Sequence, residues 1–193
     1  DPPANIELQM RHENLDMRVS GDAGARTYTY TADSLTLTEG ALWGGDGEPP
    51  IVELDLMMTD ISSTYQVTGT DPDTMRFSSD GSIGGMTMAV ELSPPPPEQG
   101  QFKAALVIGP MQASSSGTLL SLASFDQFED GVPEGFEISG SSTYGPLGFE
   151  MMFEDPSEEF EAVYTNQGGT FGASVSRDAV SYDVSATGME TRF

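Results

Sequence analysis

The chain has 193 residues, with 31 acidic and 7 basic side chains, one histidine and no cysteine, and its formal net charge is −24 at pH 7. The missing thiols exclude a disulfide scaffold, a thiolate metal site and a cysteine nucleophile. The charge argues against nucleic acid and anionic membrane surfaces as partners. The length suits one domain or two small ones, and area scaling predicts that folding hides about 70% of the unfolded chain's surface in a core.

Apolar residues alternate with polar ones along most of the chain, which is typical of antiparallel sheet with one wet face. We therefore expect an all-β fold, a long antiparallel meander of about fourteen strands that forms a curved sheet, a sandwich or an incomplete barrel. The alternating segments are centred on residues 6–10, 15–19, 28–30, 35–37, 52–58, 65–67, 75–77, 86–92, 102–108, 147–153, 160–164, 171–175 and 180–186.

Short polar segments between the apolar runs predict tight turns. Asp80-Gly81 is the strongest, because both central residues of a type I′ turn need positive φ. We expect the other turns at residues 11–14, 32–33 and 177–178, and a link between two of the last strands at 166–169.

Two segments break the alternation. Residues 93–98 contain four consecutive prolines, which form stiff polyproline II, either as a rigid loop within a single domain 1–193 or as a link between two halves. Residues 118–129 follow a period of 3.6 with Gly131 just past the end, which predicts one short helix that caps an open end of the sheet.

Four aspartates follow one another at intervals of 47, 50 and 48 residues: Asp33, Asp80, Asp130 and Asp178. This spacing has two interpretations. It marks a repeat of stacked hairpin units, or it reflects how common aspartate is in turns.

No catalytic constellation can be assembled from the sequence. His12 is the only histidine, and no Gly-x-Ser-x-Gly elbow offers it a nucleophile. No calcium-binding loop motif and no run of 18 apolar residues are present. We therefore expect a non-enzymatic protein without cofactor, metal site or transmembrane helix.

Methionine is unusually frequent, at 11 residues. Thioethers bind Cu(I), but methionine also fills irregular apolar space and adapts to varied ligands, so packing or ligand contact is the preferred interpretation. Met57 and Met152 fall on the opposite face from the apolar stripe of their own strands. The residues that we expect to line an apolar groove are Met57, Met86, Met88, Phe149, Met151, Met152 and Phe153.

Residues 28–37, 63–69 and 180–188 resemble segments of the domain of unknown function 2125 family, acidic and lysine-poor exported proteins of alphaproteobacteria. The resemblance implies a periplasmic location and a longer parent chain, of which this one is a fragment. It supplies no catalytic residues. More remotely, the alternating strands are similar to the repeating sheets of AsmA-like and LptA-like envelope proteins, which carry lipid in a long groove.

The resulting hypothesis is a periplasmic or secreted protein that binds an apolar ligand such as lipid in a groove lined by Met, Phe and Leu. The alternative is a structural, adhesive or filament-forming subunit that binds a protein partner through its strand edges. An apolar trough favours the first hypothesis, and a solid core counts against it.

Overall fold

The computed structural model describes residues 5–42, 52–71, 75–93, 100–119, 132–133 and 135–193. These residues form fourteen strands and no helix, joined in one antiparallel sheet that does not close into a barrel, so the all-β prediction is confirmed. The strands are β1 (Asn5–Glu13), β2 (Asp16–Gly21), β3 (Ala25–Leu42), β4 (Val52–Thr68), β5 (Arg76–Ile83), β6 (Gly85–Leu92), β7 (Gln101–Ile108), β8 (Met111–Thr118), β9 (Glu137–Tyr144), β10 (Leu147–Glu154), β11 (Glu159–Asn166), β12 (Gly168–Ser176), β13 (Val180–Thr187) and β14 (Glu190–Arg192).

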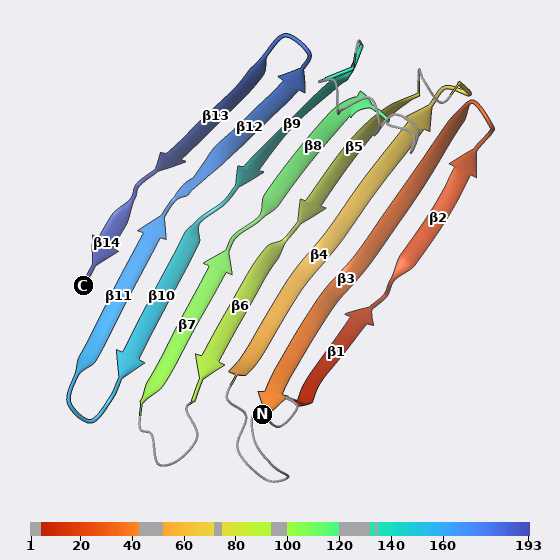
Figure 1. The fold of residues 1–193 in the computed structure, drawn as a ribbon. Helices are drawn as coiled ribbons and strands as arrows, with labels where there is room; N and C mark the ends of the chain where they lie inside the picture. The colour runs from red at the N-terminus through yellow and green to blue at the C-terminus, as the bar shows by residue number, and fades with distance from the viewer. Residues whose placement is uncertain (1–4, 43–51, 72–74, 94–99, 120–131, 134) are drawn as a thin grey trace.

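The fourteen strands line up as eight rungs, each of which crosses the whole sheet (Figure 1). β3 and β4 are each long enough to form one rung. The other rungs consist of two consecutive strands placed end to end: β1–β2, β5–β6, β7–β8, β9–β10, β11–β12 and β13–β14. Each rung runs antiparallel to the next, so the chain is a meander of eight long strands whose outer rungs are β1–β2 and β13–β14.

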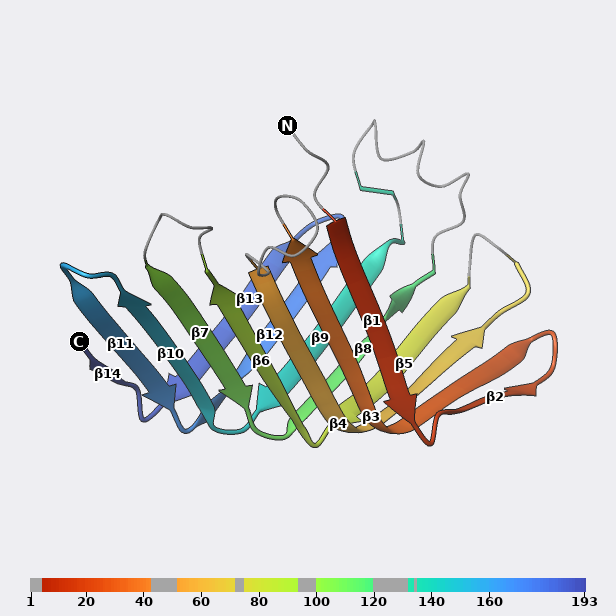
Figure 2. The same cartoon turned by 90° about the horizontal axis from the view of Figure 1, so that it is seen from below.

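All eight rungs bend at the same place, which we call the crease. Figure 2 shows that the two ends of the strands rise on the same side of the crease, so the sheet is an open trough with two walls. Every crease residue is glycine, proline or polar, and Asn14 and Asp60 have positive φ there. The crease pairs are Glu13-Asn14, Asp33-Ser34, Thr59-Asp60, Gly84-Gly85, Gly109-Pro110, Gly145-Pro146, Gln167-Gly168 and Thr187-Gly188.

The crease also resets the alternation of side chains. Gly109 N donates to Pro146 O and Gly145 N donates to Pro110 O, both at 2.7 Å. Two consecutive residues of one strand thus point their backbone groups at the same neighbour, whereas in a regular strand they point at opposite neighbours. Ile108 and Met111, three positions apart, therefore face the same side, and the apolar face of one wall continues into the other.

Several turn predictions were wrong because strand pairing overrides local turn propensity. Residues 11–14 do not reverse the chain, since β1 continues into β2 and both strands pair with β3. Residues 80–81 lie inside β5, and residues 32–33 lie inside β3 at the crease. The turn at 177–178 is confirmed between β12 and β13, and residues 166–169 link β11 to β12 across the crease without reversing the chain.

The two irregular segments lie mostly outside the described residues. Of the expected helix at 118–129, Thr118 ends β8 and residues 120–129 are not described. The prolines at 94–97 are not described either, and β6 and β7 pair with each other on either side of them.

The aspartate spacing is not a structural repeat where the structure describes it. Asp33 lies at the crease, Asp80 in the middle of β5, and Asp178 in the hairpin between β12 and β13, while Asp130 lies outside the described residues. Three equivalent sequence positions thus occupy three different places in the sheet.

The walls do not close on a solid core. Among the described residues, the only buried apolar residues are Ala32 (3% exposed) and Phe136 (8%), and neither side chain is fully enclosed. The accessible surface is 12903 Å², whereas a compact monomer of 20.5 kDa exposes about 8,900 Å². Folding hides about 57% of the surface of the unfolded chain, so the expectation of about 70% was wrong. The reason is that a single bent sheet leaves both of its faces open to solvent.

Candidate functional site: an apolar trough

One wall of the trough carries a continuous apolar inner face. We call it the methionine wall, formed by β6, β7, β10 and β11 with the adjoining halves of β3 and β4. The pairing register places Leu37, Leu56, Met88, Leu106, Phe149 and Tyr164 side by side in one row across six rungs. The parallel rows hold Leu35, Met58, Met86, Ile108 and Leu147; Leu54, Val90, Ala104, Met151 and Ala162; and Val52, Leu92, Phe102, Phe153 and Phe160. None of the side chains named in these rows is charged, and at the β3 end of the Leu54 row the register places Glu39.

The outer face of the methionine wall is polar and more exposed. Leu106 is half-buried on the inner face, while its neighbour Val107 is 53% exposed on the outer face. The outer rows also hold carboxylates such as Asp55 and Glu150, and the ion pair between Lys103 and Glu91 at 3.5 Å. Burial and charge thus both assign the apolar rows to the inside of the trough.

The opposite wall has a different inner face. We call it the serine wall, formed by β5, β8, β9 and β12 with the adjoining halves of β3 and β4. Tyr65 packs against Phe77 at 5.8 Å between ring centroids and against Tyr28 at 6.2 Å. Farther along the wall, small residues open a recess of about 310 Å³, whose lining includes Ser115, Ile138, Gly140, Phe171, Ala173 and Val175.

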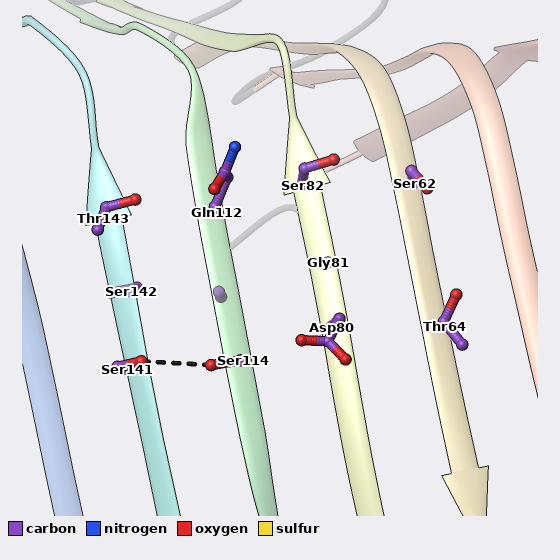
Figure 3. Close-up of a pocket in the computed structure, with 11 residues that line it drawn as sticks. Ser62, Thr64, Asp80, Gly81, Ser82, Gln112, Ser114, Ser141, Ser142 and Thr143 are labelled. Atoms are coloured by element: carbon purple, nitrogen blue, oxygen red, sulfur yellow. Dashed lines mark hydrogen bonds between the residues drawn. The ribbon is translucent and has the colours of Figure 1, made fainter.

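The outer face of the serine wall is an array of hydroxyl groups. A shallow hollow of about 470 Å³ lies on this face. Figure 3 shows the residues that line it, with the strands turning away behind them at the crease. Asp80 is the only charged residue of its lining, and Ser114 and Ser141 share a hydrogen bond of 3.2 Å. The polar side of this wall is therefore the convex side, and its aromatic and small residues face the trough.

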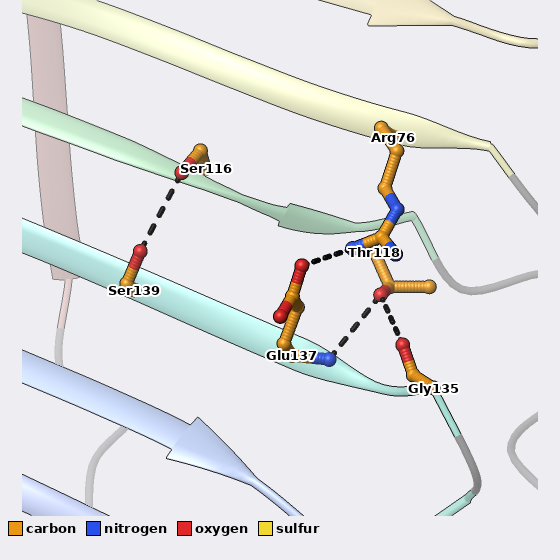
Figure 4. A network of polar contacts seen from close by, with 6 residues as sticks. All are labelled: Arg76, Ser116, Thr118, Gly135, Glu137 and Ser139. Carbon is orange, nitrogen blue, oxygen red and sulfur yellow. Dashed lines mark hydrogen bonds and ion pairs between the residues drawn. The ribbon is translucent and has the colours of Figure 1, made fainter.

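Polar contacts join the far ends of β5, β8 and β9 (Figure 4). Arg76 Nη1 lies 2.5 Å from Glu137 Oε1. The Thr118 hydroxyl donates to Gly135 O at 3.1 Å and accepts from Glu137 N at 3.2 Å. These bonds fix the rim of the serine wall.

The structure divides the seven residues that sequence analysis assigned to a groove. The five on the inner face of the methionine wall are Met86, Met88, Phe149, Met151 and Phe153. The other two lie on the outer face, as their position off the apolar stripe predicted.

Met57 lies opposite Thr36 and Thr87, and Met152 lies opposite Lys103 and Glu161. Alternation along a strand sends adjacent side chains to opposite faces. Met57 and Met152 therefore do not line the trough, and their assignment to the groove was wrong.

Sequence reasoning missed the recess in the serine wall. β8 and β9 consist mainly of Ser, Gly and Thr, so they carry no alternating apolar signal, and neither strand was predicted. They form because their neighbours β5 and β12 hold them in register.

Among the described residues of the trough, Tyr65 has a shifted pKa. Burial, and then the proximity of Tyr28, raise the pKa of Tyr65 above its ordinary value. Across the residues with described positions, no group of three His, Asp or Glu side chains is placed to hold a metal ion. No helix long and apolar enough to cross a membrane occurs in the described ranges. The apolar rows of the methionine wall can offer apolar contact to a ligand.

No protein-family model, curated protein or solved structure matches this chain. Membership of the domain of unknown function 2125 family and a periplasmic location stay predictions.

Proposed function

We propose that the protein binds a single-chain, uncharged lipid along its trough. The observation that carries this proposal is the apolar inner face of the methionine wall, whose paired rows from β4 to β11 hold no charged residue and which faces the open trough (Figure 2). Contiguous exposed apolar surface of this extent on a soluble protein marks a binding site for lipid or protein. The proposed setting, the periplasm or the extracellular medium, rests on the family resemblance alone.

The dimensions of the trough suit an extended alkyl chain. Eight rungs at about 4.8 Å spacing make a crease about 34 Å long, close to the hydrocarbon thickness of a bilayer, about 30 Å. Burying about sixteen methylene groups contributes about 13 kcal/mol. Subtracting at least about 4 kcal/mol for lost translation and rotation leaves micromolar or tighter affinity within reach.

The charge of the protein selects the head group. A net charge of −24 repels carboxylate and phosphate, and the inner rows of the methionine wall offer no cation to bind either. A monoacylglycerol should therefore bind more tightly than the corresponding fatty acid anion at pH 8.

Two adjacent residues provide a matched test. Leu106 points into the trough and Val107 points out of it, so Leu106→Asp and Val107→Asp add the same charge to opposite faces. Binding of a neutral monoacylglycerol, measured by calorimetry, should weaken at least about tenfold in Leu106→Asp, because a carboxylate replaces apolar contact. It should change less than about twofold in Val107→Asp.

Native mass spectrometry of the unmodified protein after gentle extraction supplies a second measurement, in which we expect a population with bound lipid. The proposal is wrong if the protein is repeatedly found empty and does not bind the monoacylglycerol. It is also wrong if the two variants bind equally well.

A structural role is the second candidate function. The observation that favours it is the exposure of apolar side chains along the two outer rungs, and its most specific form follows.

A further inference from the structure

Apolar exposure is concentrated at the two edges of the sheet. Of fifteen exposed large hydrophobic residues in the described part of the chain, nine belong to the outer rungs or adjoin their strands. They are Met10, Leu15, Met17 and Val19 at the first rung, and Val180, Tyr182, Val184, Met189 and Phe193 at the last. Strand edges are usually protected by charged side chains, by proline or by a bulge. β1, β2 and β13 contain no lysine or proline, and their charged residues include Arg11, Arg18 and Asp183.

The two edges have matching geometry. The last rung runs antiparallel to the first, so a second copy placed beside β13–β14 presents β1–β2 in the orientation that the meander already uses (Figure 1). Along an antiparallel strand, one residue points its backbone N–H and C=O groups at the strand on one side, and the next residue points them at the strand on the other side. Because the sheet has an even number of rungs, a row whose backbone groups point outward at the first rung also has its backbone groups pointing outward at the last rung.

The crease fixes the register between the copies. Both edges bend at it, Asn14 and Glu13 at the first rung and Gly188 and Thr187 at the last. If the crease continues, Met17 of one copy lies opposite Val184 of the next, and Val19 lies opposite Tyr182.

The charges match in the same register. Following the paired rows across the sheet puts Arg18 and Asp183 in one row and Arg11 and Glu190 in another, each pair at opposite edges. Two of the seven basic residues of the chain thus meet two carboxylates across one junction. Within one copy, Arg18 pairs with Asp16 two residues before it, at 2.5 Å.

We propose that a second copy of this chain docks its first rung on the last rung, head to tail, and extends the sheet and its trough from one molecule into the next. Because each copy carries a charge of −24, the copies repel at low ionic strength. At about 0.15 M salt the Debye length is about 8 Å, so the repulsion is screened while the directly opposed pairs remain in contact.

The test is sedimentation velocity of the 193-residue chain over a range of concentrations at 0.15 M salt. We expect the mass to rise above 20.5 kDa with concentration. Asp183→Arg should weaken association about tenfold, because it turns an attractive cross-strand pair into a repulsive one. The matched control is Asp80→Arg, which makes the same change of charge in the same row at the centre of the sheet and should not weaken association.

A charge swap decides the register. Arg18→Asp alone should weaken association as Asp183→Arg does, and the double variant carrying both changes should restore it, since the opposed charges are exchanged. A protein that stays at the mass of one copy at every concentration overturns the proposal. Equal effects of Asp183→Arg and Asp80→Arg, or a double variant as weak as either single one, overturn it as well. Lipid binding by the single copy is measured separately, so the two proposals can fail independently.

Discussion

Gly117 and Gly148 offer a sharp test of how closely the rungs approach one another. A Cβ built on Gly117 in β8 would lie 2.3 Å from Glu137 O and 2.9 Å from Ile138 Cα, both backbone atoms of β9. Non-bonded atoms this close force the two strands apart. A Cβ built on Gly148 in β10 would have no atom within 4 Å.

The magnitude follows from two opposing terms. Overpacking lowers the unfolding free energy by about 1–3 kcal/mol. Replacing glycine by alanine raises it by about 0.4–1 kcal/mol, because alanine restricts the unfolded chain. Gly117→Ala should therefore lose about 1–2 kcal/mol of unfolding free energy, or about 2–8 °C in Tm for a chain of this length. Gly148→Ala should be neutral or gain about 0.5 kcal/mol.

The assay is urea unfolding of both variants, followed by far-ultraviolet circular dichroism, with thermal melts as a check. If Gly117→Ala proves as stable as Gly148→Ala, β8 and β9 are not as closely paired as the account requires.

Two further predictions concern titration. Burial raises the pKa of Tyr65, so the stability that its phenol contributes should be present below about pH 10 and lost as the pH rises through the raised value. Ultraviolet titration should show a phenol that ionises above its ordinary pKa and is lost in Tyr65→Phe, and an unchanged high-pH part of the titration in this variant would contradict the prediction. Asp155 accepts hydrogen bonds from the hydroxyl and the backbone N–H of Ser157 and from Glu158 N, which lower its pKa. The stability that the Asp155 carboxylate contributes should be present above pH 3.8 and lost as the pH falls below that value. Asp155→Ala should therefore make the unfolding free energy less dependent on pH on the acid side. An unchanged pH dependence there would count against the hydrogen bonds of this turn.

Alternation predicted most of the strands and which of their faces is apolar. The segments around Leu54, Met88, Leu106 and Phe149 carry the signal clearly, because every second side chain faces the trough. It also placed Met57 off the apolar stripe, as the structure confirms.

The alternation of apolar and polar residues did not predict the bend of the sheet. Asp33 and Gly109-Pro110 look like turn residues in sequence, and the structure uses them to crease a rung that continues in the same direction. The distinguishing signal is the spacing of three between the innermost apolar residues on either side, as between Ile108 and Met111. A hairpin reverses the chain there, whereas a crease keeps its direction, and only the pairing of neighbouring rungs decides between them.

The methionines allow the most direct measurement of the central claim, that the inner face is an open apolar binding surface. Met86, Met88 and Met151 lie on that face, and Met57 and Met152 lie on the other. Peroxide oxidation followed by peptide mapping should show all five modified in the free protein. A saturating neutral monoacylglycerol should then protect the three inner methionines and leave the two outer ones unchanged. Equal protection on both faces, or protection of neither, would contradict the account.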